Sequence, residues 1–244
     1  MKPGSITGHA AGFGLSLCWL IATFWLAWQL LVPVNFAYPV AYKMLHIQDH
    51  IDHYGPQNRF KRDFARTTPT EQKRLFAAIV TAIQHHGNGL RDITYTTPDG
   101  YHDTLLREPE VVHLEDVANL LDKFNIAAWI SLGITVLSLA MLAWRRQLSP
   151  GPKQILIGLG GLLVATAAVL VIMGPTDTFY WLHTHIFPPN HEWFFYYQDS
   201  LMTTLMKAPD LFGFIAAIWV ALALVLFGLG MWGFRFSLKR LVRH

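Results

Sequence analysis

Four stretches of this sequence are long enough and apolar enough to cross a lipid bilayer. They cover residues 12–33, 125–145, 153–174 and 210–234. A crossing helix needs about 20 mainly apolar residues, because the hydrocarbon core of a bilayer is about 30 Å thick. Only 14% of the residues are charged, whereas about 25% are charged in an average soluble domain. The sequence therefore predicts an α-helical integral membrane protein with four transmembrane helices.

Two polar segments separate these windows, and we expect the whole chain, residues 1–244, to form a single membrane domain. The larger segment is an insert at residues 42–124, and the smaller, at residues 175–209, is rich in histidine and aromatic side chains. The first apolar window runs past the roughly 15 residues of a signal-peptide core and lacks an Ala-x-Ala cleavage site. It is therefore expected to remain as a transmembrane helix.

Basic residues flank the apolar windows in a way that orients the helices. Those in the connection after the second window and in the C-terminal tail, where no carboxylate accompanies them, are Arg145, Arg146, Lys153, Arg235, Lys239, Arg240 and Arg243. Because positively charged loops stay in the cytoplasm, both termini are expected inside (N-in/C-in), and both polar segments outside. The basic excess lies in membrane anchors rather than in one patch, so we predict no nucleic-acid partner.

The insert has the patterning of a small α+β structure. Thr68, Pro69 and Glu71 together form a helix start, with threonine as N-cap, proline at the first helical position and glutamate completing a capping box. Residues 93–96 and 101–106 flank a Pro-Asp-Gly turn and predict a β-hairpin. An amphipathic helix over residues 111–124 follows and leads directly into the second crossing.

His113 is the leading candidate for chemistry. It lies on the predicted helix 111–124, and Asp116 follows three residues later, where a carboxylate can fix the tautomer of the imidazole and raise its basicity. On the same side of the membrane, the segment 175–209 carries His183, His185 and His191. His191 follows a Pro-Pro turn, and we expect it to be a membrane-interface residue.

The chain has no motif of a familiar covalent or phosphate-binding enzyme. The sequence contains no Gly-x-Ser-x-Gly elbow, no Walker-type phosphate loop and no Cys-x-x-Cys pair. What remains is histidine as a general acid or base, which suits acyl transfer when the substrate brings its own nucleophile. A lipid hydrolase is disfavoured because no nucleophile is recognisable.

A second group of histidines supports an alternative function. His46, His50 and His53 are four and three residues apart, a spacing that puts them on one helix face and that is found among metal ligands. With the later histidine group, they are compatible with an extracytoplasmic metal-binding or sensing membrane protein without enzymatic activity. We interpret them instead as a solvated polar face, and predict neither a metal nor a cofactor.

Three motifs together resemble the lipoprotein intramolecular transacylases (Lit). They are Phe36-Ala37-Tyr38-Pro39 after the first crossing, His113-Leu114-Glu115-Asp116-Val117 before the second, and Leu182-His183 through Phe187 to Trp193 and Phe195 after the third. Their order and spacing agree with the family over nearly the whole chain. The third motif departs from the family pattern: it reads Ile186-Phe187 in place of an aromatic pair, is one residue longer before Trp193, and has Tyr196-Tyr197 in place of Asp-Pro.

The resemblance implies a small bacterial enzyme of the cytoplasmic (inner) membrane, with its active site on the extracytoplasmic side. Members of that family move the sn-2 acyl chain of a diacylglyceryl lipoprotein onto the amine of its N-terminal cysteine, which yields a lyso-form lipoprotein. The implied partners are the lipid bilayer and this lipoprotein substrate. The resemblance implies His113 and His183 as catalytic, with Asp116 orienting His113 and His185 as an alternative to His183. The implied substrate-binding residues are Tyr38, Phe187, Trp193 and Phe195.

Overall fold

The structure, a computed structural model, describes residues 6–144, 164–166 and 168–243. Within these residues, three helices are long and apolar enough to cross a membrane, and they cover Phe13–Met44, Glu108–Trp144 and Asp210–Ser237. They correspond to three of the four predicted crossings. The predicted crossing at 153–174 lies largely outside the described residues, which include from it the short apolar helix Val164–Met173.

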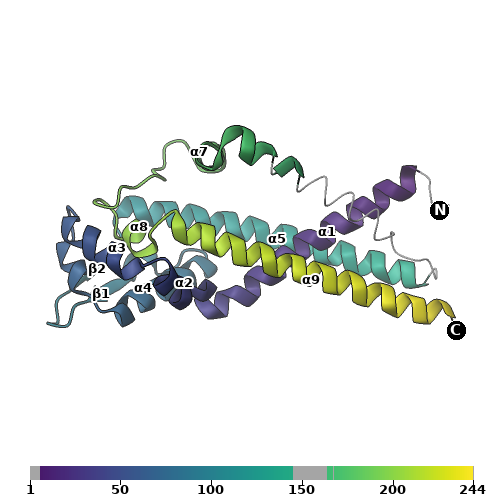
Figure 1. The fold of residues 1–244 in the computed structure, drawn as a ribbon, viewed down its shortest axis with the longest axis horizontal. Coiled ribbons are helices and arrows are strands. Elements are labelled where there is room, and N and C mark those ends of the chain that lie inside the picture. The colour runs from purple at the N-terminus through teal and green to yellow at the C-terminus, as the bar shows by residue number, and fades with distance from the viewer. Residues whose placement is uncertain (1–5, 145–163, 167, 244) are drawn as a thin grey trace. The chain divides into compact units, whose positions relative to one another are not determined.

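The described residues are mainly helical and include one two-stranded sheet (Figure 1). The α-helices are α1 (Ile6–Leu31), α2 (Tyr38–Met44), α3 (Ile47–Tyr54), α4 (Pro69–Gln84), α5 (Glu108–Trp144), α7 (Pro175–Ile186), α8 (Leu201–Met206) and α9 (Asp210–Arg243). The short 3₁₀ helices are η1 (Val32–Ala37), η2 (Gly55–Gln57), η3 (Arg62–Arg66) and η4 (Leu90–Asp92). The strands are β1 (Thr94–Thr96) and β2 (His102–Thr104).

Helix α5 confirms that the amphipathic segment and the second crossing are continuous. It runs for 37 residues without a break, which at 1.5 Å per residue is about 55 Å. Acidic Glu108 and Glu110 lie in its first turn, where they complement the helix dipole. His113 is therefore carried on a rigid element.

Two compact units make up the chain. The first comprises Met1–Ala27, Phe124–His183 and Val220–His244, and the second comprises Trp28–Lys123 and Thr184–Trp219. In the first unit, the indole nitrogen of Trp19 on α1 donates a hydrogen bond to the carbonyl of Phe227 on α9 (3.3 Å).

Many apolar side chains of the long helices are exposed, as lipid-facing side chains must be. On α5 they include Trp129, Ile130 and Leu137, and on α9 they include Val225 and Leu229. A soluble protein rarely exposes so many large apolar residues on neighbouring turns. The burial pattern thus agrees with a chain that meets lipid along these helices.

In the second unit, the predicted helix start and hairpin are both present. The Thr68 hydroxyl accepts a hydrogen bond from the Glu71 backbone N–H (3.2 Å), so Thr68 is the N-cap of α4. The predicted second half of the capping box is replaced: the Glu71 carboxylate accepts instead from the Thr96 backbone N–H (3.0 Å) and from the Arg74 guanidinium. Glu71 thereby attaches the hairpin to α4.

The hairpin is short and is supported by its neighbours. Strands β1 and β2 are antiparallel, with Tyr95 opposite Asp103. Two strands alone are marginally stable in water, so the pair needs support from elsewhere. The Tyr95 ring supplies it, because the ring is fully buried and contacts Phe64 of η3 edge-on (5.5 Å between centroids).

Candidate active site

His113 lies in an aromatic environment on α5. Its ring is half-buried and contacts Phe187 edge-on, at 5.0 Å between centroids, and lies 6.0 Å from Phe195. Both aromatic residues come from the segment after α7, more than 70 residues along the chain. The structure therefore brings together three residues that the sequence analysis assigned to one site.

Asp116 has a histidine partner that the sequence analysis did not assign to it. Its carboxylate oxygen Oδ2 lies 2.7 Å from Nδ1 of His191, and the side chains are only 14% and 32% exposed. An aspartate on Nδ1 fixes the tautomer of an imidazole and directs Nε2 away from itself. His191 thus belongs to the same region as His113, rather than being only an interface residue.

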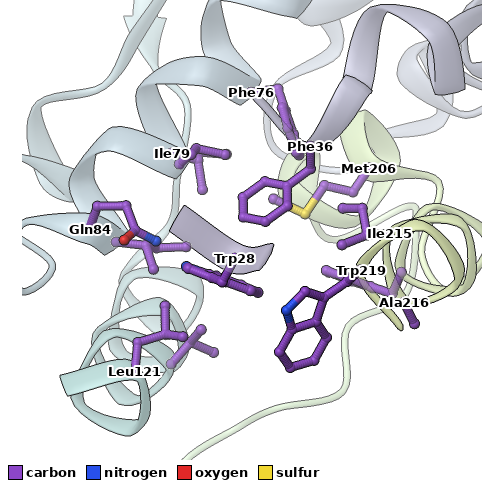
Figure 2. Close-up of a pocket in the computed structure, with 14 residues that line it drawn as sticks. Trp28, Phe36, Phe76, Ile79, Gln84, Leu121, Met206, Ile215, Ala216 and Trp219 are labelled. Carbon is purple, nitrogen blue, oxygen red and sulfur yellow. The ribbon is translucent and has the colours of Figure 1, made fainter. Parts of the chain in front are cut away.

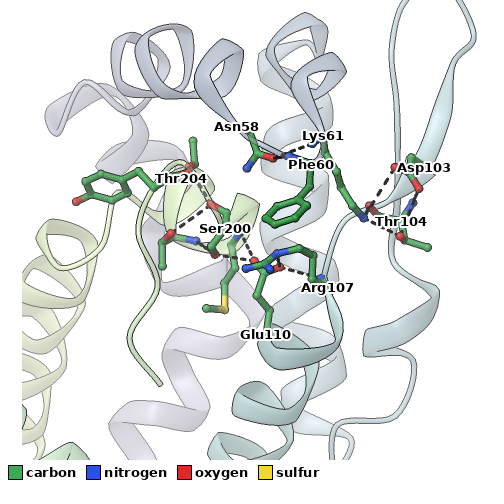
Figure 3. Close-up of polar contacts among 12 residues, drawn as sticks. Asn58, Phe60, Lys61, Asp103, Thr104, Arg107, Glu110, Ser200 and Thr204 are labelled. Atoms are coloured by element: carbon green, nitrogen blue, oxygen red, sulfur yellow. Dashed lines mark hydrogen bonds and ion pairs between the residues drawn. The ribbon is translucent and has the colours of Figure 1, made fainter. Parts of the chain in front are cut away.

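Glu110, one turn before His113, connects two helix starts (Figure 3). One carboxylate oxygen accepts from the Ser200 hydroxyl (2.6 Å) and the Met202 backbone N–H (3.1 Å) at the start of α8, and the other accepts from the Arg107 backbone N–H (2.8 Å). Because Glu110 is fully buried, these donors replace the water that its carboxylate loses. The carboxylate therefore fixes α8 against the first turn of α5.

An apolar cavity of about 240 Å³ lies in the second unit (Figure 2). Its walls come from α1, η1, α4, α5, α8 and α9, and its lining residues are Trp28, Phe36, Phe76, Ile79, Val80, Ile83, Gln84, Val117, Leu121, Met206, Phe212, Ile215, Ala216 and Trp219. None of these side chains is charged. A cavity with such a lining suits hydrocarbon better than a polar ligand.

The cavity and His113 share one face of α5. Val117 and Leu121, which line the cavity, follow His113 at intervals of four residues. Residues four apart lie one above the other on a helix. Proton-transfer chemistry at His113 would therefore take place one helical turn from the space that accepts hydrocarbon.

Comparison with known proteins identifies the family. The sequence profile of the lipoprotein intramolecular transacylase Lit matches residues 13–209. The chain belongs to the Lit family. Membership confirms the resemblance noted from the sequence, and with it the prediction of an enzyme of the transacylase class.

Two solved structures of membrane-integral Lit from Bacillus cereus share the fold. One carries a histidine-to-arginine mutation; it has a TM-score of 0.66 at 19% identity, over 96% of this chain and 93% of that chain. The other has a TM-score of 0.65 at 17% identity, over 97% of this chain and 98% of that chain. Among curated protein sequences, none matches significantly.

The residues of this Lit-family chain that were expected to bind substrate have different surroundings. Tyr38 is 1% exposed, donates a hydrogen bond to the Leu205 carbonyl (2.7 Å) and stacks on Phe76 (3.9 Å between centroids). Phe76 lines the cavity, so Tyr38 supports a cavity wall from behind. Phe195 is buried beside His113, and Trp193 is half-buried and contacts the exposed Phe194 edge-on (6.2 Å).

His183 and His185 lie on α7. Nδ1 of His183 lies 2.8 Å from the Phe179 carbonyl, and burial lowers the pKa of His183 below its ordinary value, which favours the neutral ring needed in a base. His185 is exposed, with Nδ1 3.3 Å from the Thr184 hydroxyl. His183 belongs to the first unit and His113 to the second, so a joint role of these two histidines, inferred from the Lit resemblance, stays a prediction.

The histidines of the alternative metal hypothesis differ in their solvent exposure and in their contacts. His46 is exposed and pairs with Asp49 (3.3 Å), whereas His50 is buried against the rings of Tyr54 and Tyr197. In the part of the chain that the structure describes, no three His, Cys, Asp or Glu side chains gather as metal ligands do. The geometry gives the alternative no support.

Proposed function

We propose that this Lit-family chain moves the sn-2 acyl chain of a diacylglyceryl lipoprotein onto the amine of its N-terminal cysteine. Family membership supports the class of reaction. The observation that carries the proposal is the position of His113, one helical turn from an apolar cavity on the same face of α5. A transacylase needs a proton acceptor beside a hydrocarbon site, and these two features meet there.

For this reaction the protein mainly has to orient the substrate and transfer protons. The amine nitrogen attacks the carbonyl carbon of the ester, the new C–N bond forms, and the C–O bond to the glycerol breaks. One proton leaves the attacking nitrogen and one returns to the glycerol oxygen. Because ester and amine are on one molecule, correct placement alone can supply roughly 7–11 kcal/mol of barrier lowering.

His113 is proposed to take the proton from the amine. His183, with His185 as its alternative, is proposed to stabilise the oxyanion or to return the proton to the glycerol oxygen. Asp116 was predicted to orient His113. Its hydrogen bond to His191 supports a further role, in which Asp116 fixes the ring of His191 as a second imidazole near the reaction. Histidine acid–base catalysis of this kind contributes about 10²–10⁴-fold to a rate.

The same proposal includes the arrangement in the membrane. We propose a single domain over residues 1–244 with a fourth crossing at 153–174 and both termini in the cytoplasm of a bacterium, so that residues 42–124 and 175–209 lie outside the inner membrane. The charge distribution of the sequence supports this orientation. Residues 145–153 and the C-terminal tail, 235–244, carry lysine and arginine without carboxylates.

The test is mass spectrometry of lipoprotein N-termini from cells that make this chain or its variants. Cells with the unaltered chain are expected to produce lyso-form lipoprotein, and His113→Ala is expected to reduce the yield by about 10²-fold or more, because the proton acceptor is lost. His102→Ala, an exposed histidine of β2, is the matched control and is expected to behave as the unaltered chain. Undiminished lyso-form product from His113→Ala would refute the assignment.

A further inference from the structure

The apolar cavity has features of a binding site for a single linear chain. Its 14 lining residues include no charged residue and five aromatic ones, which are Trp28, Phe36, Phe76, Phe212 and Trp219. Water in such a space would find few polar partners, because Gln84 and the two indole nitrogens are the only polar side-chain groups in the lining. The cavity therefore favours a hydrocarbon occupant.

The aromatic wall is rigidly held. The Trp28 ring contacts Phe36 at 4.6 Å and Trp219 at 5.5 Å between centroids, both edge-on. Edge-on contacts between aromatic rings stabilise their arrangement beyond the effect of the area that they bury. The three rings thus form a continuous surface from η1 through α1 to α9.

The backbone beside this wall is strained. Asn35, Phe36 and Ala37 have φ values of 48°, 51° and 55°, in the left-handed region that non-glycine residues seldom adopt because of a steric clash at Cβ. Strain of this kind persists where surrounding contacts enforce it, and it is concentrated at binding and catalytic sites. Here it turns the chain so that Phe36 points into the cavity (Figure 2).

The lining also has a direction. On α5 the lining residues are Val117 and Leu121, which follow His113 at intervals of four residues, and on α9 the lining residues extend from Phe212 to Trp219. Leu121 and Trp219 are the lining residues furthest along their helices. An ester held at His113 would therefore have its hydrocarbon tail beside Val117 and its terminus near Leu121 and Trp219.

We propose that this cavity binds the acyl chain that is transferred, and that Ala216 and Trp219 on α9 limit its length. The proposal rests on the proposed transacylase function, and it commits to one occupant, the sn-2 acyl chain of the diacylglyceryl lipoprotein. Ala216 is the smallest side chain of the lining, so the space beside it is the space that a longer chain would use. Trp219 is the last lining residue along α9 and lies where the chain would end.

The first test locates the chain without requiring turnover. A diacylglyceryl lipopeptide with a photoreactive group at the end of its sn-2 chain is irradiated with the full-length protein in lipid, and the modified residues are mapped by mass spectrometry. Modification at Leu121, Ile215 or Trp219 is the expected result. Modification confined to residues outside the cavity lining would overturn the proposal, even if the protein proves to be a transacylase.

The second test changes the size of the cavity. With an equal mixture of lipopeptides bearing short and long sn-2 chains, Ala216→Phe is expected to shift the ratio of products toward the short chain by about tenfold, because the phenylalanine ring excludes the last methylenes of the longer chain from the cavity. Trp219→Ala is expected to shift it toward the long chain. Ala217→Phe, the next residue on α9 and no part of the lining, is the matched control.

The outcomes separate this inference from the proposed function. If the unaltered protein turns over and neither variant changes the product ratio, the acyl site is refuted and the proposed transacylase reaction still stands. Absence of any turnover by the unaltered protein, together with photolabelling inside the cavity, refutes the proposed reaction and supports an acyl-binding site.

Discussion

Asp116 and His191 are 75 residues apart in the sequence, yet their side chains share a hydrogen bond of 2.7 Å. His113 could be singled out from the sequence because its neighbours on the same helix are fixed by helical periodicity. His191 could not, since no local pattern relates a residue after a Pro-Pro turn to a carboxylate on a distant helix. The same reason hid Glu110, whose sequence signal is only that of an acidic first turn.

His50 makes stability depend on pH. Burial, and secondarily the charge of Lys207, lowers the pKa of His50 to about 4, whereas an unfolded histidine titrates near 6.5. Between these values the unfolded chain binds more protons, so the free energy of unfolding falls as the pH is lowered from about 6.5 to 4. The loss from this group is on the order of 3 kcal/mol, because one pKa unit corresponds to about 1.4 kcal/mol.

Thermal unfolding in detergent between pH 7 and pH 4 measures this dependence. His50→Phe keeps an aromatic ring against Tyr54 and Tyr197 but cannot titrate, so its Tm is expected to fall less on acidification than that of the unaltered protein. His102→Phe, at an exposed histidine of β2, is expected to leave the pH dependence unchanged. An identical decrease in His50→Phe and the unaltered protein would contradict the prediction.

At the scale of elements, those with local start signals or turn residues were predictable. Helix α4 begins where Thr68 and Pro69 require it, and the hairpin closes at the Pro-Asp-Gly turn. Helix α8 was not predicted, although Ser200 caps it, because six residues give too little periodicity. The η1 turn was not predicted either, since its left-handed residues are not glycines and are held by tertiary contacts.

The packing of α1 against α9 depends on Gly230. A Cβ atom at this position would lie 2.2 Å from Cζ2 of Trp19, and the Trp19 ring is held by its hydrogen bond to the Phe227 carbonyl. Gly230→Ala is therefore expected to lower the free energy of unfolding by about 1–3 kcal/mol, the usual cost of overpacking. Unfolding by denaturant in detergent measures the change.

Gly228 provides the control on the same helix. A Cβ atom there would meet nothing within 4 Å, so Gly228→Ala is expected to leave stability unchanged or to raise it by up to about 1 kcal/mol through helix propensity. Equal stability of the two alanine variants would show that the contact of Gly230 with Trp19 does not limit the approach of the helices.

At the scale of the whole molecule, the number of crossings determines which segments face outward. In a variant with Cys18→Ser, we expect Asn88→Cys in the insert to react with a membrane-impermeant thiol reagent in intact cells, and Ser149→Cys to react only after lysis. The physical reason is that basic connections stay in the cytoplasm, so the proposed orientation puts residues 145–153 there. Labelling of Ser149→Cys in intact cells would contradict the proposed orientation.

The sequence by itself determined the class of the molecule: apolar length fixes which segments can enter a membrane, and helical periodicity places His113, Val117 and Leu121 on one face. The tertiary structure decided what that face meets. The cavity needs walls from six elements, and the pairing of Asp116 with His191 and of Glu110 with Ser200 joins residues that are far apart in the chain. Periodicity orients a side chain within its own helix, but only the packing of the chain selects its partners.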